Sequence, residues 1–243
     1  MSSTASKILS SIGLCLLAIY ICWAMMMPDS RYSNTCGEVR VYLTDSVSRQ
    51  FVRTNEILSM MRQNDLMPNG IQVNKLNTEA IEKLIASHNL LRKVVCFTSP
   101  NGDIILKLSQ RIPKYRVIGE NGDYFVDIER FPMKVTTRTA SYVPIVTGNI
   151  SQELATGEMF DFVSYIEDDS FWSVQIEQII VNNKVVKLIP RVGAHTIIMG
   201  GLDNYERKLA KLEKLYTDGF SEQLGWRDYK EIDLRYEGQI VCR

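Results

Sequence analysis

The chain has 243 residues, of which 45% are hydrophobic and 23% charged, ordinary values for a globular protein of one large or two modest domains. Lysine plus arginine and aspartate plus glutamate balance at 28 each. This balance gives no reason to expect electrostatic capture of nucleic acid, and we expect no nucleic-acid partner.

The first distinctive feature is an uncharged stretch of twenty residues at 8–27. A helix of that length, rising about 1.5 Å per residue, spans the roughly 30 Å hydrocarbon core of a bilayer. A cleaved signal peptide, with its shorter apolar region and small-residue cleavage site, fits less well, as do a lipoprotein signal and a buried core helix. We predict an uncleaved transmembrane helix at 8–27, in contact with lipid and preceded by a short tail at 1–7. The charged residues on either side of this helix do not indicate which of its ends faces the cytoplasm.

Short alternating elements follow the apolar stretch. We predict a strand, two helices and two strands at 38–43, 54–65, from 78 onward, 91–98 and 103–110. Ile81, Leu84 and Ile85 share one helical face, and Asn101-Gly102 between the last two strands is typical of a β-hairpin. The order resembles that of a POTRA domain, a small docking module with two helices on one face of a three-stranded sheet. We place this domain at 37–111.

The second half, at 112–243, is predicted to be mostly strand. The expected strands are 114–118, 124–128, 173–181, 184–189, 228–236 and 239–243. A short helix is expected over 152–166 and a longer one from about Asp203 to Gly219. The predicted fold class is therefore α+β, with one N-terminal transmembrane helix, a β-α-α-β-β domain of POTRA type, and a mostly β domain that has a long helix and a C-terminal edge strand.

Histidine and serine motifs for catalysis are missing from the sequence. His88 and His195 lie far apart and form no HExxH pair, and the sequence contains no GxSxG, Ser-x-x-Lys, P-loop or GxGxxG segment. The acidic cluster 167–169, with Asp161 nearby, is the best remaining candidate for paired carboxylates. Such a cluster is more typical of a solvated loop. We predict no catalytic residue and no small-molecule substrate.

The cysteines give no metal or disulfide signal. Outside the apolar stretch lie Cys36, Cys96 and Cys242, an odd number without a CxxC motif, so neither a zinc site nor a disulfide framework is indicated. Their redox state stays open, and no cofactor is expected.

Five short segments carry a family resemblance: 109–113 (SQRIP), 124–127 (YFVD), 143–148 (VPIVTG), 208–216 (KLAKLEKLY) and 232–236 (IDLRY). In this order they resemble the Gln/Glu-Arg-x-Pro signature, the "yyvD" strand, the proline-then-Thr-Gly segment, the long helix and the "vDLRY" strand of the FtsQ/DivIB family of bacterial cell-division proteins. One departure follows Asp127, where 128–132 (IERFP) lacks the frequent Asp-x-x-Gly.

The resemblance implies a non-catalytic scaffold of the bacterial inner membrane. It implies a single-pass protein with 1–7 in the cytoplasm, the bulk in the periplasm, and concentration at the division septum. The implied role is to recruit and bridge division proteins, with FtsB and FtsL as partners; others could bind through the POTRA-like domain. Two alternatives stay open, a membrane-anchored cell-wall hydrolase and a POTRA scaffold of a transport or secretion system.

The C-terminal edge is the predicted partner site. By resemblance, the last strand pairs with an extended segment of FtsB, and an edge strand offers unpaired N–H and C=O groups for such pairing. The predicted partner-binding residues are Tyr236, Gln239, Ile240, Val241, Cys242 and Arg243, with Arg207, Lys208 and Lys211 of the long helix as receptors for acidic side chains. Proline at Val241 is expected to damage an added ladder more than the fold. Alternatively, Ile240 and Cys242 merely pack inward and the basic residues form a solvated face.

Overall fold

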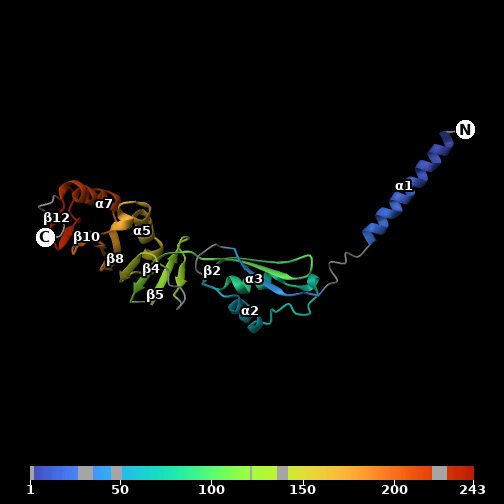
Figure 1. Cartoon of the computed structure of the whole chain (residues 1–243), viewed down its shortest axis with the longest axis horizontal. Helices are drawn as coiled ribbons and strands as arrows, with labels where there is room; N and C mark the ends of the chain where they lie inside the picture. The colour runs from blue at the N-terminus through green and yellow to red at the C-terminus, as the bar shows by residue number, and fades with distance from the viewer. Residues whose placement is uncertain (1–2, 27–34, 45–50, 121, 136–141, 221–228) are drawn as a thin grey trace. The chain divides into compact units, whose positions relative to one another are not determined.

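The computed structural model describes residues 3–26, 35–44, 51–120, 122–135, 142–220 and 229–243 (Figure 1). The predicted N-terminal helix is present as α1, Ser3–Met26, and its side chains are described over 13–25. Within the described residues, no helix has both the length and the apolar character needed to cross a membrane.

The chain forms two compact units that do not follow the sequence in simple order. The first contains Met1–Ser46, Arg53–Ser87 and Lys93–Leu108. The second contains Ser109–Arg243 together with His88–Arg92 and a short segment that ends at Val52. Two short pieces of chain that precede the predicted boundary at 111 therefore belong to the second unit.

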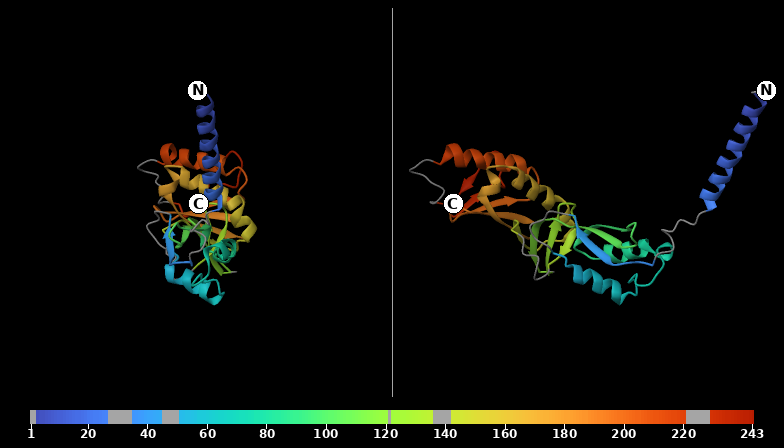
Figure 2. Two further views of the ribbon diagram at one scale, coloured as in Figure 1. Left: turned by 90° about the vertical axis from the view of Figure 1, so that its right-hand side faces the viewer. Right: turned by 45° about the vertical axis from the view of Figure 1, so that its right-hand side comes forward.

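The first unit is built on the predicted strand, two helices and two strands, of which the last two strands each have two end residues in the second unit. These are β1 (Val39–Leu43), α2 (Thr54–Gln63), α3 (Thr78–Ala86), β2 (Leu91–Thr98) and β3 (Ile104–Gln110), with a short 3₁₀ turn, η2 (Val73–Lys75), before α3. The sheet order is β1-β3-β2, with β1 parallel to β3. Both helices lie on one face of this sheet (Figures 1 and 2). The predicted POTRA-like arrangement is confirmed.

The second unit is built on a nine-stranded sheet in the order β12-β11-β10-β9-β8-β7-β4-β5-β6. Its strands are β4 (Pro113–Gly119), β5 (Gly122–Asp127), β6 (Pro132–Lys134), β7 (Ile145–Gly148), β8 (Ile176–Asn182), β9 (Val185–Pro190), β10 (Thr196–Gly200), β11 (Glu231–Asp233) and β12 (Val241–Cys242). The pairs β4–β7, β7–β8 and β10–β11 are parallel. The carboxyl ends of β7, β8 and β10 therefore lie at the same end of the sheet.

Helices of the second unit connect the parallel strands. They are α4 (Gln152–Thr156), α5 (Glu158–Asp168) and α6 (Trp172–Gln175) between β7 and β8, and α7 (Tyr205–Lys214), which continues as a π-helical turn, η3 (Leu215–Gly219), after β10. Helices α5 and α7 cover one face of the sheet (Figures 1 and 2). Their contact includes the edge-to-face rings of Phe162 and Tyr205, whose centroids are 5.2 Å apart. Tyr115, fully buried, donates its hydroxyl hydrogen to the carbonyl of Ala155.

Several predicted boundaries differ from the structure. The predicted helix over 152–166 is divided at Gly157, whose backbone (φ −105°, ψ −116°) is not helical. Residues 173–175, predicted as strand, are helical in α6. The predicted strand at 228–236 is reduced to the three residues of β11, and Asp228 lies outside the described residues. His88 lies beyond the end of α3, and its Nδ1 accepts the N–H of Leu90 at 3.3 Å.

Candidate functional site

The last strand, β12, is the outermost strand at one end of the nine-stranded sheet. It pairs antiparallel with β11, and Glu231 and Arg243 exchange both backbone hydrogen bonds, at 2.9 and 3.0 Å. In an antiparallel ladder such pairs alternate with pairs that exchange none. Val241 therefore directs its N–H and C=O toward Asp233 of β11, whereas Cys242 directs its own away from the sheet.

This alternation corrects the choice of Val241 for proline substitution. The N–H of Val241 belongs to the internal ladder, so proline there damages the existing fold first. The outward row belongs to Cys242 and, by the same alternation, to Ile240. No strand among the described residues lies beyond β12 to occupy that row. The side chains of Ile240 and Cys242 pack against the core, so these residues combine inward side chains with outward backbone groups.

The basic residues of α7 are largely engaged within the chain. Lys211 Nζ donates to the carbonyls of Tyr236, at 3.3 Å, and Gln239, at 3.2 Å. These bonds hold the loop that leads into β12. Lys208 Nζ donates to the carbonyl of Gly201 at 2.9 Å, and only 13% of its side chain is exposed.

Arg207 is the most accessible of the three basic residues. Its side chain is 69% exposed, and its contact with Glu237 is long, at 3.4 Å. It lies with Lys211, Arg235 and Tyr236 around a hollow of about 240 Å³ beside the loop before β12. Of the three predicted receptors for acidic side chains, Arg207 is thus the one that a partner reaches without breaking a short internal bond.

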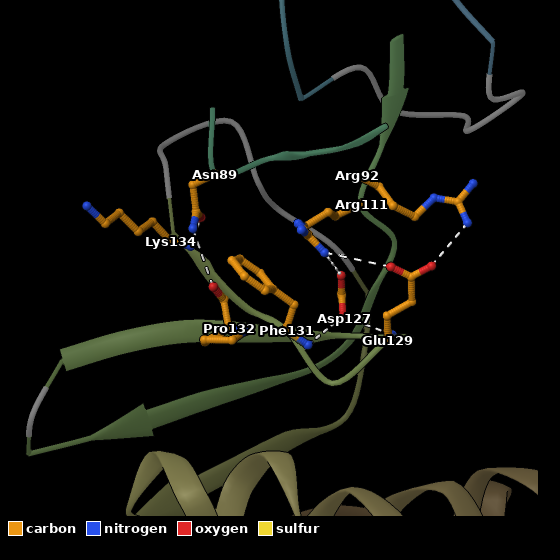
Figure 3. A network of polar contacts seen from close by, with 8 residues as sticks. All are labelled: Asn89, Arg92, Arg111, Asp127, Glu129, Phe131, Pro132 and Lys134. Atoms are coloured by element: carbon orange, nitrogen blue, oxygen red, sulfur yellow. Dashed lines mark hydrogen bonds and ion pairs between the residues drawn. The ribbon is translucent and has the colours of Figure 1, made fainter. Parts of the chain in front are cut away.

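The opposite edge of the sheet, β6, is closed by one side chain. Asn89 Oδ1 accepts the N–H of Lys134 at 2.6 Å, and Asn89 Nδ2 donates to the carbonyl of Pro132 at 3.4 Å (Figure 3). The amide of Asn89 thus takes the place of a neighbouring strand, and Pro132 has no N–H to offer. Among the described residues the two edges therefore differ: the amide of Asn89 occupies β6, and no strand pairs with the outer side of β12.

Two comparisons with known proteins bear on identity. Residues 112–243 match the family model for "FtsQ/DivIB, C-terminal related", and residues 34–109 match the model for a POTRA-like domain. The chain belongs to the FtsQ/DivIB family. No curated protein matches it closely enough to be reported as a relative. Together, an FtsQ/DivIB-related domain and a POTRA-like domain are those of a cell-division scaffold, and both kinds of domain are typically non-catalytic.

Two segments that carry the resemblance to FtsQ/DivIB meet in one buried ion pair. Arg111, from 109–113, donates through Nη1 to Asp127 Oδ2 at 2.7 Å, and the Asp127 side chain is fully buried (Figure 3). Asp127 Oδ1 also accepts the N–H groups of Glu129 and Phe131, at 2.9 and 2.7 Å. The guanidinium of Arg111 lies 3.7 Å from the ring centroid of Phe131. This network fixes the turn between β5 and β6.

The IDLRY segment of this FtsQ/DivIB-family chain forms a second ion pair beside the open edge. Asp233 is buried, and its carboxylate accepts from Arg235 Nη2 at 2.6 Å and from Arg235 Nε at 2.9 Å. These hydrogen bonds lower the pKa of Asp233. Gly200, at φ +77°, leaves room for the Arg235 side chain, because an added Cβ would lie 2.8 Å from its Cγ.

The acidic candidates for catalysis have structural contacts. Glu167 pairs with Lys114 at 2.7 Å, Asp161 pairs with Arg130 at 2.5 Å, and Asp169 Oδ1 caps α6 by accepting the N–H of Trp172 at 3.0 Å. Among the described residues, no group of three or more His, Cys, Asp or Glu converges in a metal-binding arrangement.

His195 is a buried histidine that lies just before β10. Its Nε2 lies 2.5 Å from the hydroxyl of Tyr216, and burial lowers its pKa. Its Nδ1 has no hydrogen-bond partner in the part of the chain that the structure describes. The ring of Tyr216, in η3, also lies 6.1 Å from that of Trp172 and 5.7 Å from that of Phe220, centroid to centroid, so the pair is part of an aromatic cluster that packs η3 on the second unit.

Sequence reasoning did not find Asn89 or the pairing of Asp233 with Arg235. Asn89 lies in an ordinary loop sequence, and its role depends on β6, a strand 43 residues later. The spacing of Asp233 and Arg235, two residues apart in the strand predicted at 228–236, was a usable signal, because such residues share one face of a sheet.

Proposed function

We propose that this chain is a non-catalytic scaffold of the bacterial division machinery that binds an extended segment of FtsB by strand addition to β12. Through FtsB it recruits FtsL and bridges division proteins at the septum. The observation that carries the proposal is the contrast between the two sheet edges. β6 is occupied by Asn89, whereas Cys242 directs its backbone N–H and C=O outward. An added strand gains affinity from such backbone groups and selectivity from alternate side chains.

Charge at the edge supports a partner with acidic side chains. The hollow beside the loop before β12 is lined by Arg207, Lys208, Lys211 and Arg235 against Asp203 and Glu237. The exposed guanidinium of Arg207 is placed for a carboxylate that lies just beyond an added strand. Rim pairs of this kind add more to association rate and selectivity than to affinity.

Anchoring in the inner membrane is the second part of the proposal. It is supported by the twenty uncharged residues at 8–27 and by their helical conformation over most of that length in α1. In this arrangement 1–7 is cytoplasmic, and the POTRA-like domain and the FtsQ/DivIB-related domain that follow α1 are periplasmic. Mass spectrometry of the membrane fraction tests the anchor: an intact N-terminus supports it, and a mature N-terminus near Met25 contradicts it.

Strand addition is tested by pull-down of FtsB with three full-length variants. Cys242→Pro removes the outward N–H, so we expect at least about tenfold lower recovery. Cys242→Ala, the matched control, loses the same side-chain packing but keeps the N–H, so recovery is expected to stay near wild type. Val241→Pro breaks the ladder with β11 and is expected to lower the free energy of unfolding.

Equal recovery by folded Cys242→Pro and Cys242→Ala proteins would exclude pairing at β12. The wider role is tested by a fluorescent fusion. A mid-cell band is expected for a division scaffold, whereas a transport scaffold would follow an outer-membrane barrel and a hydrolase would degrade isolated peptidoglycan.

A further inference from the structure

A cavity of about 1050 Å³ lies in the second unit, at the end of the sheet where β7, β8 and β10 finish. Its floor includes the buried side chains of Val181 and Val186, and Leu154, Leu202 and Tyr205 are half-buried around it. Crevices outside the carboxyl ends of parallel strands are common binding positions. The apolar floor and open mouth suit the aliphatic part of a long side chain.

The charges that line this cavity are mainly negative. Three carboxylates, Glu158, Asp161 and Asp203, face one ammonium group, that of Lys184. Asp161 is neutralised by Arg130 at 2.5 Å, and Asp203 has a long contact with Lys208 at 3.3 Å. Glu158 is exposed and forms no ion pair with any described residue. The apolar residues Val181, Val186 and Leu154 beside these carboxylates suit an organic cation that carries an aliphatic stem.

The acidic cavity adjoins the cationic hollow at the edge, because Asp203 lines both. One side of Asp203 presents Arg207, Lys211 and Arg235, and the other presents Glu158. The cationic hollow is lined by Tyr236 and Glu237 of the loop before β12, so it is the nearer of the two to a strand added at β12. The two hollows together therefore form a continuous surface whose charge changes sign along its length.

We propose that the acidic cavity is the far half of the partner site and receives a lysine or arginine side chain of the same segment that adds to β12. This inference rests on the proposed function and specifies the chemistry of the partner. The aliphatic stem of that side chain packs on Leu154, Leu202 and Tyr205, and its cationic head reaches Glu158. The surface then favours a segment whose acidic and basic residues follow one another in a fixed order, and it disfavours segments with charges of one sign only.

The test is the affinity of full-length variants for the extramembrane part of FtsB, measured at low and at physiological salt. Glu158→Lys replaces an attraction with a repulsion, and we expect about five- to tenfold weaker binding at low salt and a smaller effect as salt screens the charges. Glu153→Lys is the matched control, because Glu153 is also exposed, lies nearby on α4 and does not line the cavity. It is expected to bind like wild type.

Charge reversal in the partner completes the test. One Lys→Glu or Arg→Glu variant of FtsB is expected to weaken binding to wild type and to restore binding to Glu158→Lys. Equal affinities of Glu158→Lys and Glu153→Lys would overturn the inference, as would self-association of the chain that Glu158→Lys abolishes without effect on FtsB. Cys242→Pro separates the two proposals. If it loses FtsB while Glu158→Lys does not, strand addition stands and the acidic cavity is not part of the site.

Discussion

Burial should decide how much each of two similar ion pairs contributes to stability. Arg111–Asp127 and Arg116–Asp123 have the same N–O distance of 2.7 Å; the first joins the segment before β4 to the end of β5, and the second joins β4 to the start of β5. The Asp127 side chain is fully buried and that of Arg111 is 15% exposed, whereas Arg116 and Asp123 are 35% and 36% exposed. The pair of aspartates therefore offers a comparison in which distance is constant and solvation differs.

We expect Asp127→Asn to lower the free energy of unfolding of the second unit by about 3 kcal/mol, because removing one partner leaves the other charge poorly solvated. The asparagine can still accept the N–H groups of Glu129 and Phe131 through Oδ1, so this variant removes mainly the charge. Asp127→Ala removes those acceptors too, and each unsatisfied N–H adds about 1–3 kcal/mol. Asp123→Asn is expected to cost less than about 1 kcal/mol.

The measurement is urea unfolding followed by the fluorescence of Trp172, which is buried in the second unit. Trp23 and Trp226 are replaced by phenylalanine so that the signal reports this unit alone, since a chain of two units need not unfold in one step. The reasoning would be refuted if Asp127→Asn lowered the free energy of unfolding by less than about 1 kcal/mol, the same as Asp123→Asn. Asp127 would then be solvated like a surface group.

Three further predictions concern single positions. Gly148→Ala should lower the free energy of unfolding, measured in urea, by more than about 2 kcal/mol, because Gly148 has φ +113° and an added Cβ would lie 2.0 Å from a carbonyl oxygen of β8. Gly238→Ala is the comparison: Gly238 has φ +75° but no atom within 4 Å of an added Cβ, so the loss should be about 1 kcal/mol. Burial raises the pKa of Cys96 to about 11, so iodoacetamide at pH 8 should label Cys96 slowly in the folded chain and rapidly in urea; rapid labelling of folded protein would contradict its burial. Burial lowers the pKa of His195, so the folded state binds fewer protons than the unfolded one, and stability should fall as pH drops below the ordinary histidine value of about 6.5. The His195→Gln variant should lose less stability between neutral and acidic pH than wild type. Identical stability–pH profiles for the two proteins would contradict this role of His195.

Local signals were sufficient to predict most of the first unit. The helical spacing of Ile81 and Ile85 and the Asn101-Gly102 turn depend on neighbouring residues, and the predicted order of elements is confirmed. In the second unit, β7 was not predicted. It is a short strand between two parallel neighbours, β4 and β8, and parallel strands are not joined by a tight turn, so no turn signal beside β7 marks it in the sequence.

The candidate site was only partly accessible to sequence reasoning. The position of β12 as an edge strand follows from the order of elements, but which residues point outward depends on the register with β11, and that register places Cys242 rather than Val241 on the open side. The internal bonds of Lys208 and Lys211 depend on loops that fold back from β10 and β11, so their spacing on a helix could not reveal them.

The interleaving of the two compact units also bears on how the chain acquires its fold. The second unit needs Asn89 to close β6, and Gln110 Oε1 accepts the N–H groups of Phe51 and Val52 at 2.7 and 3.0 Å. Because the chain is synthesised from its N-terminus, these early segments can form their contacts only after the later partner residues have been made. A fragment that begins at 112 would therefore lack pieces of its own unit, and its β6 edge would be exposed to aggregation.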